Sequence, residues 1–203
     1  MSEGIQATLK SDRSRGARRA EILQALVAML QEPEFEKVTT ARLATVLGLS
    51  EAALYRHFSS KAAMYDALLD FIEESLAGLF AQVRETESMS GRDQVRTMIS
   101  ILLDFADANP GLVRILTGQA LVYESPKLTE RVRRLFASYE LGLKLAFRKA
   151  IAEHELPADF NASGRASLVL SFVIGQWQRF ALSGLRDRPN QIGSTSLEIF
   201  FAD

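Results

Sequence analysis

The stretch from Thr39 to Lys61 constrains the fold of this chain more than any other part of the sequence. It reads TTARLATVLGLSEAALYRHFSSK, with two short helix-forming segments on either side of Gly48. Glycine takes the left-handed conformation that often ends a helix without steric strain. Two short helices joined by such a turn are the sequence form of a helix-turn-helix. Double-stranded DNA is therefore the first partner to consider.

Polar residues stand where the two short helices should begin. Thr39 is a good N-cap for a helix that ends near Leu47, and Ser50 is a good N-cap for the next one. That second helix is expected from Glu51 to about Phe58. Each cap side chain would accept a hydrogen bond from a backbone amide of the first turn.

On a helical wheel, the helix that starts at Glu51 has a buried side and an outer side. Leu54 and Phe58 point toward the other helices, whereas Ala52, Tyr55 and Arg56 lie on the other side or at its edge. Alanine lets a helix approach the major groove closely, and its methyl group can contact a thymine methyl. The guanidinium group of Arg56 can make a bidentate contact to guanine.

Other polar side chains of this stretch suit phosphate contacts, which hold a protein in register without reading sequence. We assign this role to Thr40, Tyr55, His57 and Lys61. A solvent-exposed or packed imidazole is the alternative for His57. With both cap residues included, the predicted DNA-binding set is Thr39, Thr40, Ser50, Ala52, Tyr55, Arg56, His57 and Lys61.

The chain ahead of this stretch divides into an arm and a helix. Residues 1 to about 17 are polar, contain two glycines and lack apolar periodicity, so we predict a disordered basic arm. The arm either reaches DNA phosphates or a minor groove, or it is a solvated terminus. A helix is expected from Arg18 to about Gln31. The net charge is only -1, but residues 1–61 hold nine Lys and Arg against seven Asp and Glu.

Residues 61–203 have the apolar periodicity of a larger helical body. Helices are expected at about 61–85, 94–108, 112–122, 128–154 and 162–185, with a last short one at 197–201. Apolar residues lie nearly all round the helix at 162–185, which predicts burial on two sides. We therefore expect Phe172, Trp177 and Phe180 at an interface with a second subunit, formed together with the helix at 128–154. The predicted fold class is all-α.

Composition excludes several classes of function. The chain has no cysteine, and no run of apolar residues is long enough to cross a membrane or to resemble a secretion signal. It also lacks a glycine-rich phosphate loop and a cluster of histidines and carboxylates at metal-ligand spacing. We expect a cytoplasmic protein that is not an enzyme and needs no metal or cofactor.

The segments LATVLGLS, ALYRHF and the following SK resemble the DNA-binding head of TetR-family regulators. The hallmark of that head is an L-Y-x-H-F ending of the recognition helix, which is matched here from Leu54 to Phe58. The resemblance implies an all-helical homodimer that binds palindromic DNA. It places a three-helix head in residues 18–60 and a body for dimerisation in residues 61–203. In the family, movement of the helix that starts at Lys61 changes the separation of the two recognition helices.

A closer resemblance is to the nucleoid occlusion factors within that family. It is carried by ANPGLVRILTGQALVYE at residues 108–124 and by DFIEESL at residues 70–76. The resemblance implies a nucleoid-associated protein that, when bound to DNA, engages the tubulin-like division protein FtsZ and blocks ring assembly over the chromosome.

The same resemblance implies that Phe71 and Asn109 contact FtsZ. Two residues depart from the pattern, because Leu79 and Ala108 stand where the resembling proteins carry arginines. Those charges would contribute to meeting an acidic partner, so the departures bear on partner affinity and on partner identity. An ordinary core position is the alternative for Phe71, and an ordinary turn residue is the alternative for Asn109.

A second hypothesis is a ligand-responsive transcriptional repressor of the same family. Its body would hold a small-molecule cavity of several hundred Å³. Aromatic and methionine side chains that could line it are Met98, Phe105, Phe172 and Trp177. Such residues at helical spacing also occur in an ordinary core, and a body packed solid to native density would count against this hypothesis.

Overall fold

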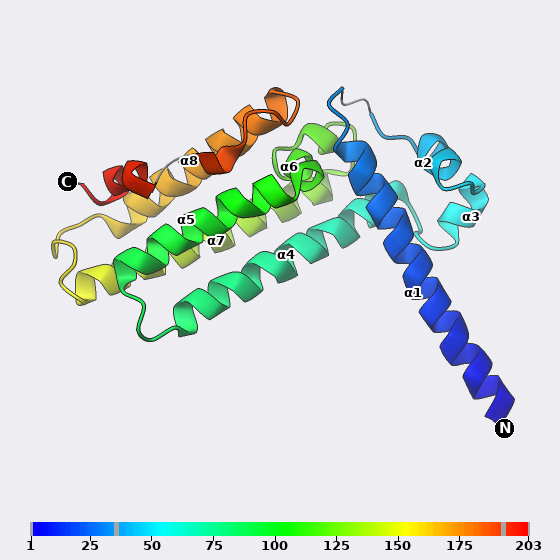
Figure 1. Cartoon of the computed structure of the whole chain (residues 1–203), viewed down its shortest axis with the longest axis horizontal. Helices are drawn as coiled ribbons and strands as arrows, with labels where there is room; N and C mark the ends of the chain where they lie inside the picture. Colours follow the sequence, from blue (N-terminus) through cyan, green and yellow to red (C-terminus); the bar gives the residue numbers. More distant parts are fainter. Residues whose placement is uncertain (1, 35–36, 192–193, 203) are drawn as a thin grey trace.

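The computed structural model describes the backbone of residues 2–34, 37–191 and 194–202, and side chains from residue 16 onward apart from residues 35–36, 192–196 and 203. All regular structure in these ranges is helical, which confirms the predicted fold class (Figure 1). The elements in chain order are α1 (Ser2–Leu30), α2 (Thr40–Val46), α3 (Glu51–Tyr55), α4 (Lys61–Glu85), α5 (Gly91–Ala108), α6 (Pro110–Leu116), η1 (Gln119–Leu121), α7 (Pro126–Ala152), α8 (Ala162–Leu182), η2 (Pro189–Gln191) and η3 (Ser194–Phe201).

Helices α1, α2 and α3 form a head at one end of the molecule (Figure 1). The predicted caps are present: the Thr39 hydroxyl accepts from the amide of Arg42 at 3.2 Å, and the Ser50 hydroxyl accepts from that of Ala53 at 3.2 Å. Gly48 has a φ of 64°, the left-handed conformation expected for the turn. Leu43 is fully buried between the helices. The local signals of the sequence therefore place this turn correctly.

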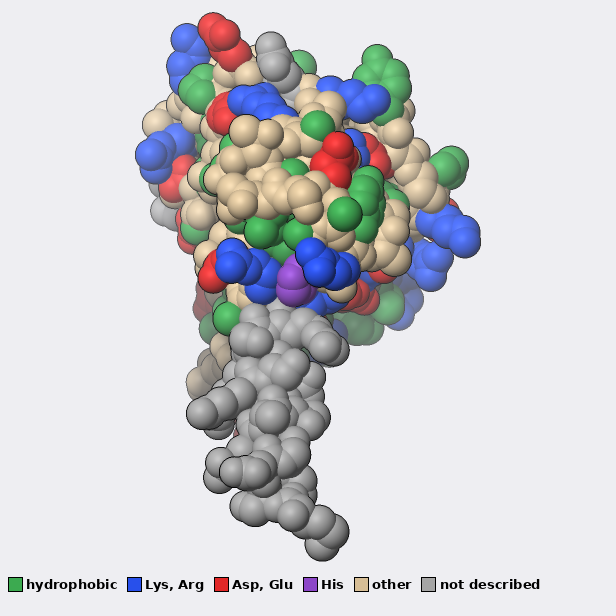
Figure 2. Space-filling view, turned by 90° about the vertical axis from the view of Figure 1, so that its right-hand side faces the viewer, with side chains coloured by type: hydrophobic (Ala, Val, Ile, Leu, Met, Phe, Trp, Pro, Cys, Tyr) green, Lys and Arg blue, Asp and Glu red, His purple; other side chains and the backbone are tan. Residues whose placement is uncertain are grey.

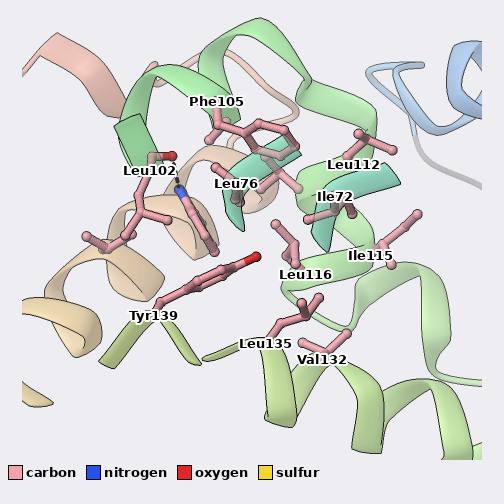
Figure 3. Packing of buried hydrophobic residues seen from close by; sticks show 14 of the residues in the cluster. Ile72, Leu76, Leu102, Phe105, Leu112, Ile115, Leu116, Val132, Leu135 and Tyr139 are labelled. Atoms are coloured by element: carbon pink, nitrogen blue, oxygen red, sulfur yellow. Dashed lines mark hydrogen bonds between the residues drawn. The ribbon is translucent and has the colours of Figure 1, made fainter. Parts of the chain in front are cut away.

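The body is built around α7, which packs against α4, α5 and α8. Tyr139 of α7 is buried, and Figure 3 shows its hydroxyl directed toward the centre of the body. That oxygen finds no hydrogen-bond partner among the described residues, and burial raises the pKa of Tyr139, so the phenol stays protonated. Figure 3 labels the side chains that meet there: Ile72, Leu76, Leu102, Phe105, Leu112, Ile115, Leu116, Val132, Leu135 and Tyr139.

The first helix is longer than predicted. Helix α1 begins at Ser2, whereas the sequence pattern predicts a disordered arm up to about residue 17. The buried side chains of Ile22, Leu26 and Leu30 hold the C-terminal part of α1 against the molecule. Extending a helix that already exists costs far less than nucleating one, so weak propensity suffices for the residues ahead of them. Side chains of residues 1–15 lie outside the described residues, and their phosphate contacts stay a prediction.

Helix α5 also begins earlier than predicted, at Gly91 instead of Gln94. Ser90 is the N-cap, and its hydroxyl accepts from the amide of Asp93 at 3.3 Å. Two carboxylates that follow α7 add to this cap: Glu153 accepts from the amide of Gly91 at 2.7 Å, and Glu155 accepts from that of Arg92 at 2.9 Å. Negative charge at a helix N-terminus is stabilising. A β-carbon placed on Gly91 would lie 2.0 Å from the backbone nitrogen of Ala150. The two helices therefore meet at backbone distance.

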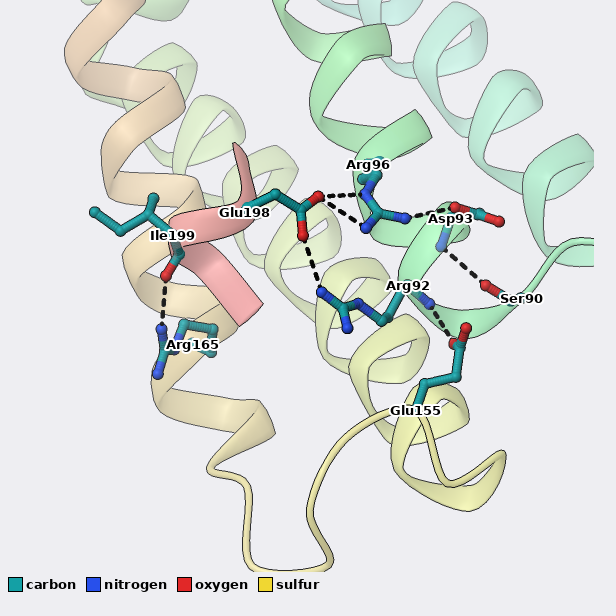
Figure 4. Close-up of polar contacts among 8 residues, drawn as sticks. All are labelled: Ser90, Arg92, Asp93, Arg96, Glu155, Arg165, Glu198 and Ile199. Carbon is teal, nitrogen blue, oxygen red and sulfur yellow. Dashed lines mark hydrogen bonds and ion pairs between the residues drawn. The ribbon is translucent and has the colours of Figure 1, made fainter. Parts of the chain in front are cut away.

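The C-terminal segment is tied to the body by ion pairs. Glu198 of η3 accepts hydrogen bonds from Arg92 at 2.9 Å and from Arg96 at 3.0 and 2.8 Å (Figure 4). Arg165 of α8 donates to the carbonyl of Ile199 at 3.1 Å. The predicted short helix at 197–201 is present as part of a longer 3-10 helix.

Replacing Gly91 by alanine should destabilise the protein, because the new β-carbon would push α5 and α7 apart. The expected cost is about 1–3 kcal/mol or more, typical of overpacking. Gly78→Ala is the matched control, since a β-carbon there meets nothing within 4 Å. The control should be stabilising by roughly 0.5–1 kcal/mol, as for a glycine inside a helix. Urea unfolding followed by circular dichroism measures both, and equal midpoints would contradict the close approach.

Candidate nucleic-acid interface

Helix α3 presents the face that the helical wheel predicts. Leu54 and Phe58 are buried, whereas Ala52, Tyr55 and Arg56 are exposed on the head. Figure 2 looks at this end of the molecule and shows Lys and Arg side chains on both sides of a histidine. The outer face of α3 is therefore free to enter a groove, and positive charge lies beside it.

Hydrogen bonds join the start of α2 to α3. The Thr40 hydroxyl donates to a Glu51 carboxylate oxygen at 2.6 Å, and the Tyr55 hydroxyl donates to the Thr40 oxygen at 3.4 Å. These contacts hold Thr40 and Tyr55 next to each other on the exposed side. Thr39 and Ser50 use their hydroxyl oxygens as helix caps. Each cap hydroxyl would have to donate to a phosphate while its oxygen still accepts the hydrogen bond from the helix amide.

His57 lies in a concave surface together with Arg56, and it has a neighbour that the sequence analysis missed. Arg19 of α1 donates to the His57 carbonyl, and its guanidinium carbon lies 4.1 Å from the centroid of the Phe58 ring. The Nδ1 atom of His57 is buried and finds no hydrogen-bond partner within the described residues. Arg19 holds the end of the recognition segment against α1. Spacing alone cannot identify this contact, because it joins residues 38 positions apart.

Lys61 is engaged inside the protein. Its Nζ lies 2.5 Å from a carboxylate oxygen of Glu124 and donates to the carbonyl of Val38 at 2.7 Å. The predicted phosphate contact would require this ammonium group to leave both partners or to share them. The assignment of Lys61 to phosphate binding therefore stays a prediction, and it includes the free energy needed to break or share these two contacts.

Phe71 and Asn109, the residues implied to bind a partner, line one groove of about 540 Å³. Phe71 of α4 is 50% exposed, so it is not an ordinary core residue. The Asn109 side chain donates to the carbonyl of Phe105 at 2.9 Å, which ends α5. The other lining residues come from three helices and the residue after the first of them: Ala20, Leu23, Gln24, Val27 and Ala28 of α1, Gln31 directly after it, Leu68 of α4 and Leu112 of α6.

The sequence analysis missed the α1 wall of this groove. Leu23 and Val27 lie in the helix expected from Arg18 to about Gln31, and both are partly buried. Their exposed remainder faces the groove because α1 packs against α6. The only signal in the sequence is that these two residues widen the apolar stripe of α1 beyond its buried side.

Two of the three residues assigned to a subunit interface, Trp177 and Phe180, require a correction, whereas Phe172 stays a prediction. Trp177 is fully buried, with its indole nitrogen donating to the Leu102 carbonyl at 3.1 Å, and Phe180 is buried as well. Phe172 packs edge-on against Phe200 with ring centroids 5.2 Å apart. Trp177 and Phe180 belong to the core of the protomer. Helix α5 and the C-terminal segment cover the side of α8 where the sequence pattern predicts a second subunit.

Three of the four side chains expected to line a ligand cavity lie in the same core. Met98 and Trp177 are fully buried, and Phe105 is nearly so. Within the described residues, no three His, Asp or Glu side chains are grouped to hold a metal ion. Among those residues there is also no helix with the length and hydropathy needed to cross a membrane.

Replacing Arg56 by alanine should cost about 1–3 kcal/mol of binding free energy on a preferred DNA site, if the guanidinium reads a guanine. The loss should disappear when one base pair of each half-site is changed. Fluorescence anisotropy on sites obtained by selection measures this. Arg84→Ala, which removes the same charge at the far end of α4, is the control. Equal weakening on every sequence would make Arg56 a phosphate contact instead.

Comparison with known proteins agrees with this geometry. Residues 22–68 match the tetR family of bacterial regulatory proteins, and residues 92–203 match an SlmA-like, tetracyclin repressor-like C-terminal domain. The nucleoid occlusion factor SlmA of Vibrio cholerae is 42% identical over 175 residues, covering 85% of this chain and 88% of the relative. The SlmA of Pectobacterium carotovorum is 41% identical over 179 residues, covering 86% and 88%.

Solved structures extend the likeness to the fold. A TetR transcription regulator from Haloarcula marismortui superposes with a TM-score of 0.74 at 20% identity, over 92% of this chain and 97% of that one. The regulator PfmR from Thermus thermophilus gives 0.72 at 20% identity, over 89% and 96%. These relatives are regulators, which confirms the prediction that the chain is not an enzyme. The chain belongs to the TetR family of DNA-binding regulators, in the branch of the nucleoid occlusion factors named SlmA.

Proposed function

We propose that this protein binds palindromic DNA sites as a homodimer and, when bound to DNA, inhibits FtsZ ring assembly over the chromosome. The observation that carries the proposal is the groove that contains Phe71 and Asn109, because one of its walls belongs to the DNA-binding head. The inhibitor would be associated with the nucleoid through its DNA sites.

The lining of the groove indicates what it binds. It contains seven apolar side chains and three carboxamides, Gln24, Gln31 and Asn109, with no charged residue. Apolar side chains of a peptide would fill the hollow, and carboxamides can both donate to and accept from its backbone. An uncharged, apolar segment of FtsZ fits this chemistry better than an acidic one.

The position of the groove explains how DNA would control it. Helix α1 forms one wall, and α4 and α6 form the other. A β-carbon placed on Gly111 of α6 would lie 2.7 Å from the carbonyl oxygen of Val27, so α1 and α6 touch at backbone distance. DNA that fixes the head also fixes α1, and with it the width of the groove. Binding at the two sites is then reciprocal by thermodynamic linkage.

The two departures from the pattern of the resembling proteins lie close to this groove in the sequence. Leu79 follows Phe71 by eight residues, about two turns of α4, and it is partly exposed. Ala108 is exposed and directly precedes Asn109. Both changes make the surroundings less positive, which agrees with an apolar segment as the ligand.

Replacing Phe71 by alanine should abolish the inhibition of FtsZ without changing DNA binding. The wild-type protein should reduce the amount of sedimenting FtsZ polymer in the presence of GTP only when its DNA sites are added. The aromatic ring supplies the largest apolar surface in the groove, so its loss should weaken FtsZ binding by about 2–4 kcal/mol. Ile199→Ala, which truncates an exposed apolar residue on η3, is the control.

A wild-type protein that binds DNA tightly and leaves FtsZ polymer unchanged would contradict the proposal. A ligand-responsive repressor would then be the better hypothesis, with the groove as its small-molecule site, since 540 Å³ lies in the range of such sites.

The homodimer interface is proposed on the outer sides of α7 and α8. Leu141 and Leu145 lie one turn apart on α7 and are both exposed, as is Leu168 on α8. A β-carbon on Gly175 of α8 would meet nothing within 4 Å, so the backbone is accessible there. Each of these leucines would contribute at most about 1.5–3 kcal/mol to the free energy of association when a second copy buries it.

Leu145→Glu should convert the dimer to a monomer, because a carboxylate would be buried without a partner at the interface. Sedimentation velocity at micromolar concentration measures the change. Ile199→Glu, which introduces the same charge outside α7 and α8, should leave the dimer intact. A Leu145→Glu variant that still sediments as a dimer would move the interface to another surface.

A further inference from the structure

The head contacts the body at a second place, separate from the groove. A hollow of about 270 Å³ lies between the residues that lead into α2, Lys37 and Val38, and the loop that follows η1, which contains Tyr123 and Glu124. Lys61, the first residue of α4, is also part of its lining. Apart from Lys61, a predicted phosphate contact, no residue that lines this hollow has a role in the proposed binding of DNA or of FtsZ.

The central contact is the ion pair between Lys61 and Glu124. The two charged atoms are 2.5 Å apart, and the side chains are only 16% and 9% exposed. Lys61 also donates to the carbonyl of Val38 at 2.7 Å, and its Nζ lies 5.9 Å from the centroid of the Tyr65 ring. The ammonium group is thus enclosed by a body residue, a head carbonyl and an aromatic ring of α4.

A second lysine makes a parallel contact at the surface. The Nζ of Lys37 lies 4.7 Å from the centroid of the Tyr123 ring, a cation–π distance. Tyr123 is 76% exposed, so it contributes little to the core. Two adjacent body residues, Tyr123 and Glu124, therefore hold the segment that leads into α2. We call these contacts the loop latch.

An ion pair of this kind affects geometry more than stability. The desolvation of two buried charges largely cancels their attraction, so such a pair adds little net free energy of folding. The pair is nevertheless directional. It holds Lys61 in place, and the ammonium group of Lys61 donates to the Val38 carbonyl. Val38 is followed by Thr39, which caps α2, and by Thr40, a predicted phosphate contact.

We propose that Glu124 and Tyr123 are positioning residues for DNA recognition. Through Lys61 and Lys37 they hold the segment that leads into α2. They therefore set the angle at which the head presents α3 to the major groove of DNA. This inference rests on the proposed binding of palindromic DNA. A dimer that reads two half-sites needs both heads at one separation, whereas non-specific binding to phosphates tolerates many.

The test variant is Glu124→Gln, which keeps the shape of the side chain and removes its charge. Glu85→Gln, on the exposed C-terminal end of α4, changes the charge of the chain equally and is the control. If only about a tenth of the dimers keep both heads correctly oriented, affinity for a selected palindrome should fall about tenfold. Affinity for random DNA and the salt dependence of binding should match the control.

A readout without DNA separates the latch from the charge of Glu124. The chain has no cysteine, so Val46→Cys on the exposed side of α2 can carry a single spin label per protomer. Double electron-electron resonance then gives the distance distribution between the two heads. Glu124→Gln should broaden it, and Glu85→Gln should leave it narrow.

Three outcomes would overturn the inference. Tighter binding of Glu124→Gln to all DNA would mean that Glu124 merely masks the Lys61 charge. Identical affinity and distance distribution for Glu124→Gln and Glu85→Gln would remove the latch. If Glu124→Gln does not fold, Tyr123→Ala replaces it, and an unchanged distribution for that exposed residue would overturn the inference.

Failure of the proposed function can be told apart from failure of the latch. A wild-type protein with no preference for any palindrome would contradict the proposed function. The distance distribution measured without DNA would still decide whether Glu124 and Tyr123 hold the head.

Discussion

The packing of helix α4 is the constraint on which the rest of the structure depends. It starts beside the head at Lys61 and ends at Glu85 at the far end of the body, without interruption. Its side chains at Leu69, Ile72 and Leu76 are fully buried. A helix anchored along its length in this way transmits displacement as a rigid rod, so it connects the head with the groove beside Phe71 and with the body.

Three smaller contacts fix how the head sits on that rod. Gly111 allows α6 to approach α1 at backbone distance, and the loop latch holds the lead-in to α2. Between them, Arg114 of α6 is almost fully buried and donates to the carbonyl of Pro33 at 3.4 Å; burial lowers the pKa of its guanidinium group. Buried charges and a glycine contact tolerate little displacement. These contacts favour one orientation of the head, and because the groove shares α1 with the head, a change of that orientation also changes the width of the groove.

The predictions that succeeded rest on local rules. Caps at Thr39 and Ser50, the turn at Gly48 and the bounds of α4 follow from interactions within a few residues, which spacing reveals. Failures occur where a distant segment intervenes. Helix α5 starts at Gly91 because Ser90 caps it, a signal that the spacing of apolar residues does not contain, and because Glu153 and Glu155 accept from its first amides from 62 and 63 residues away. Trp177 faces the core because α5 and α7 cover its side of α8, through Leu102 and Phe136, and an all-round apolar pattern does not indicate which side a second subunit would cover.

The sequence by itself determined the helix-turn-helix, the exposed face with Ala52, Tyr55 and Arg56, and the all-helical class, since these depend on periodicity and capping. It also pointed to Phe71 and Asn109 through its likeness to a family. Only the tertiary structure decided that these two residues share a groove with α1, that Arg19 supports His57, and that Lys61 is paired with Glu124. The physical reason is that contacts between residues tens of positions apart depend on how helices pack, and helical spacing contains no record of which helix comes to lie against which.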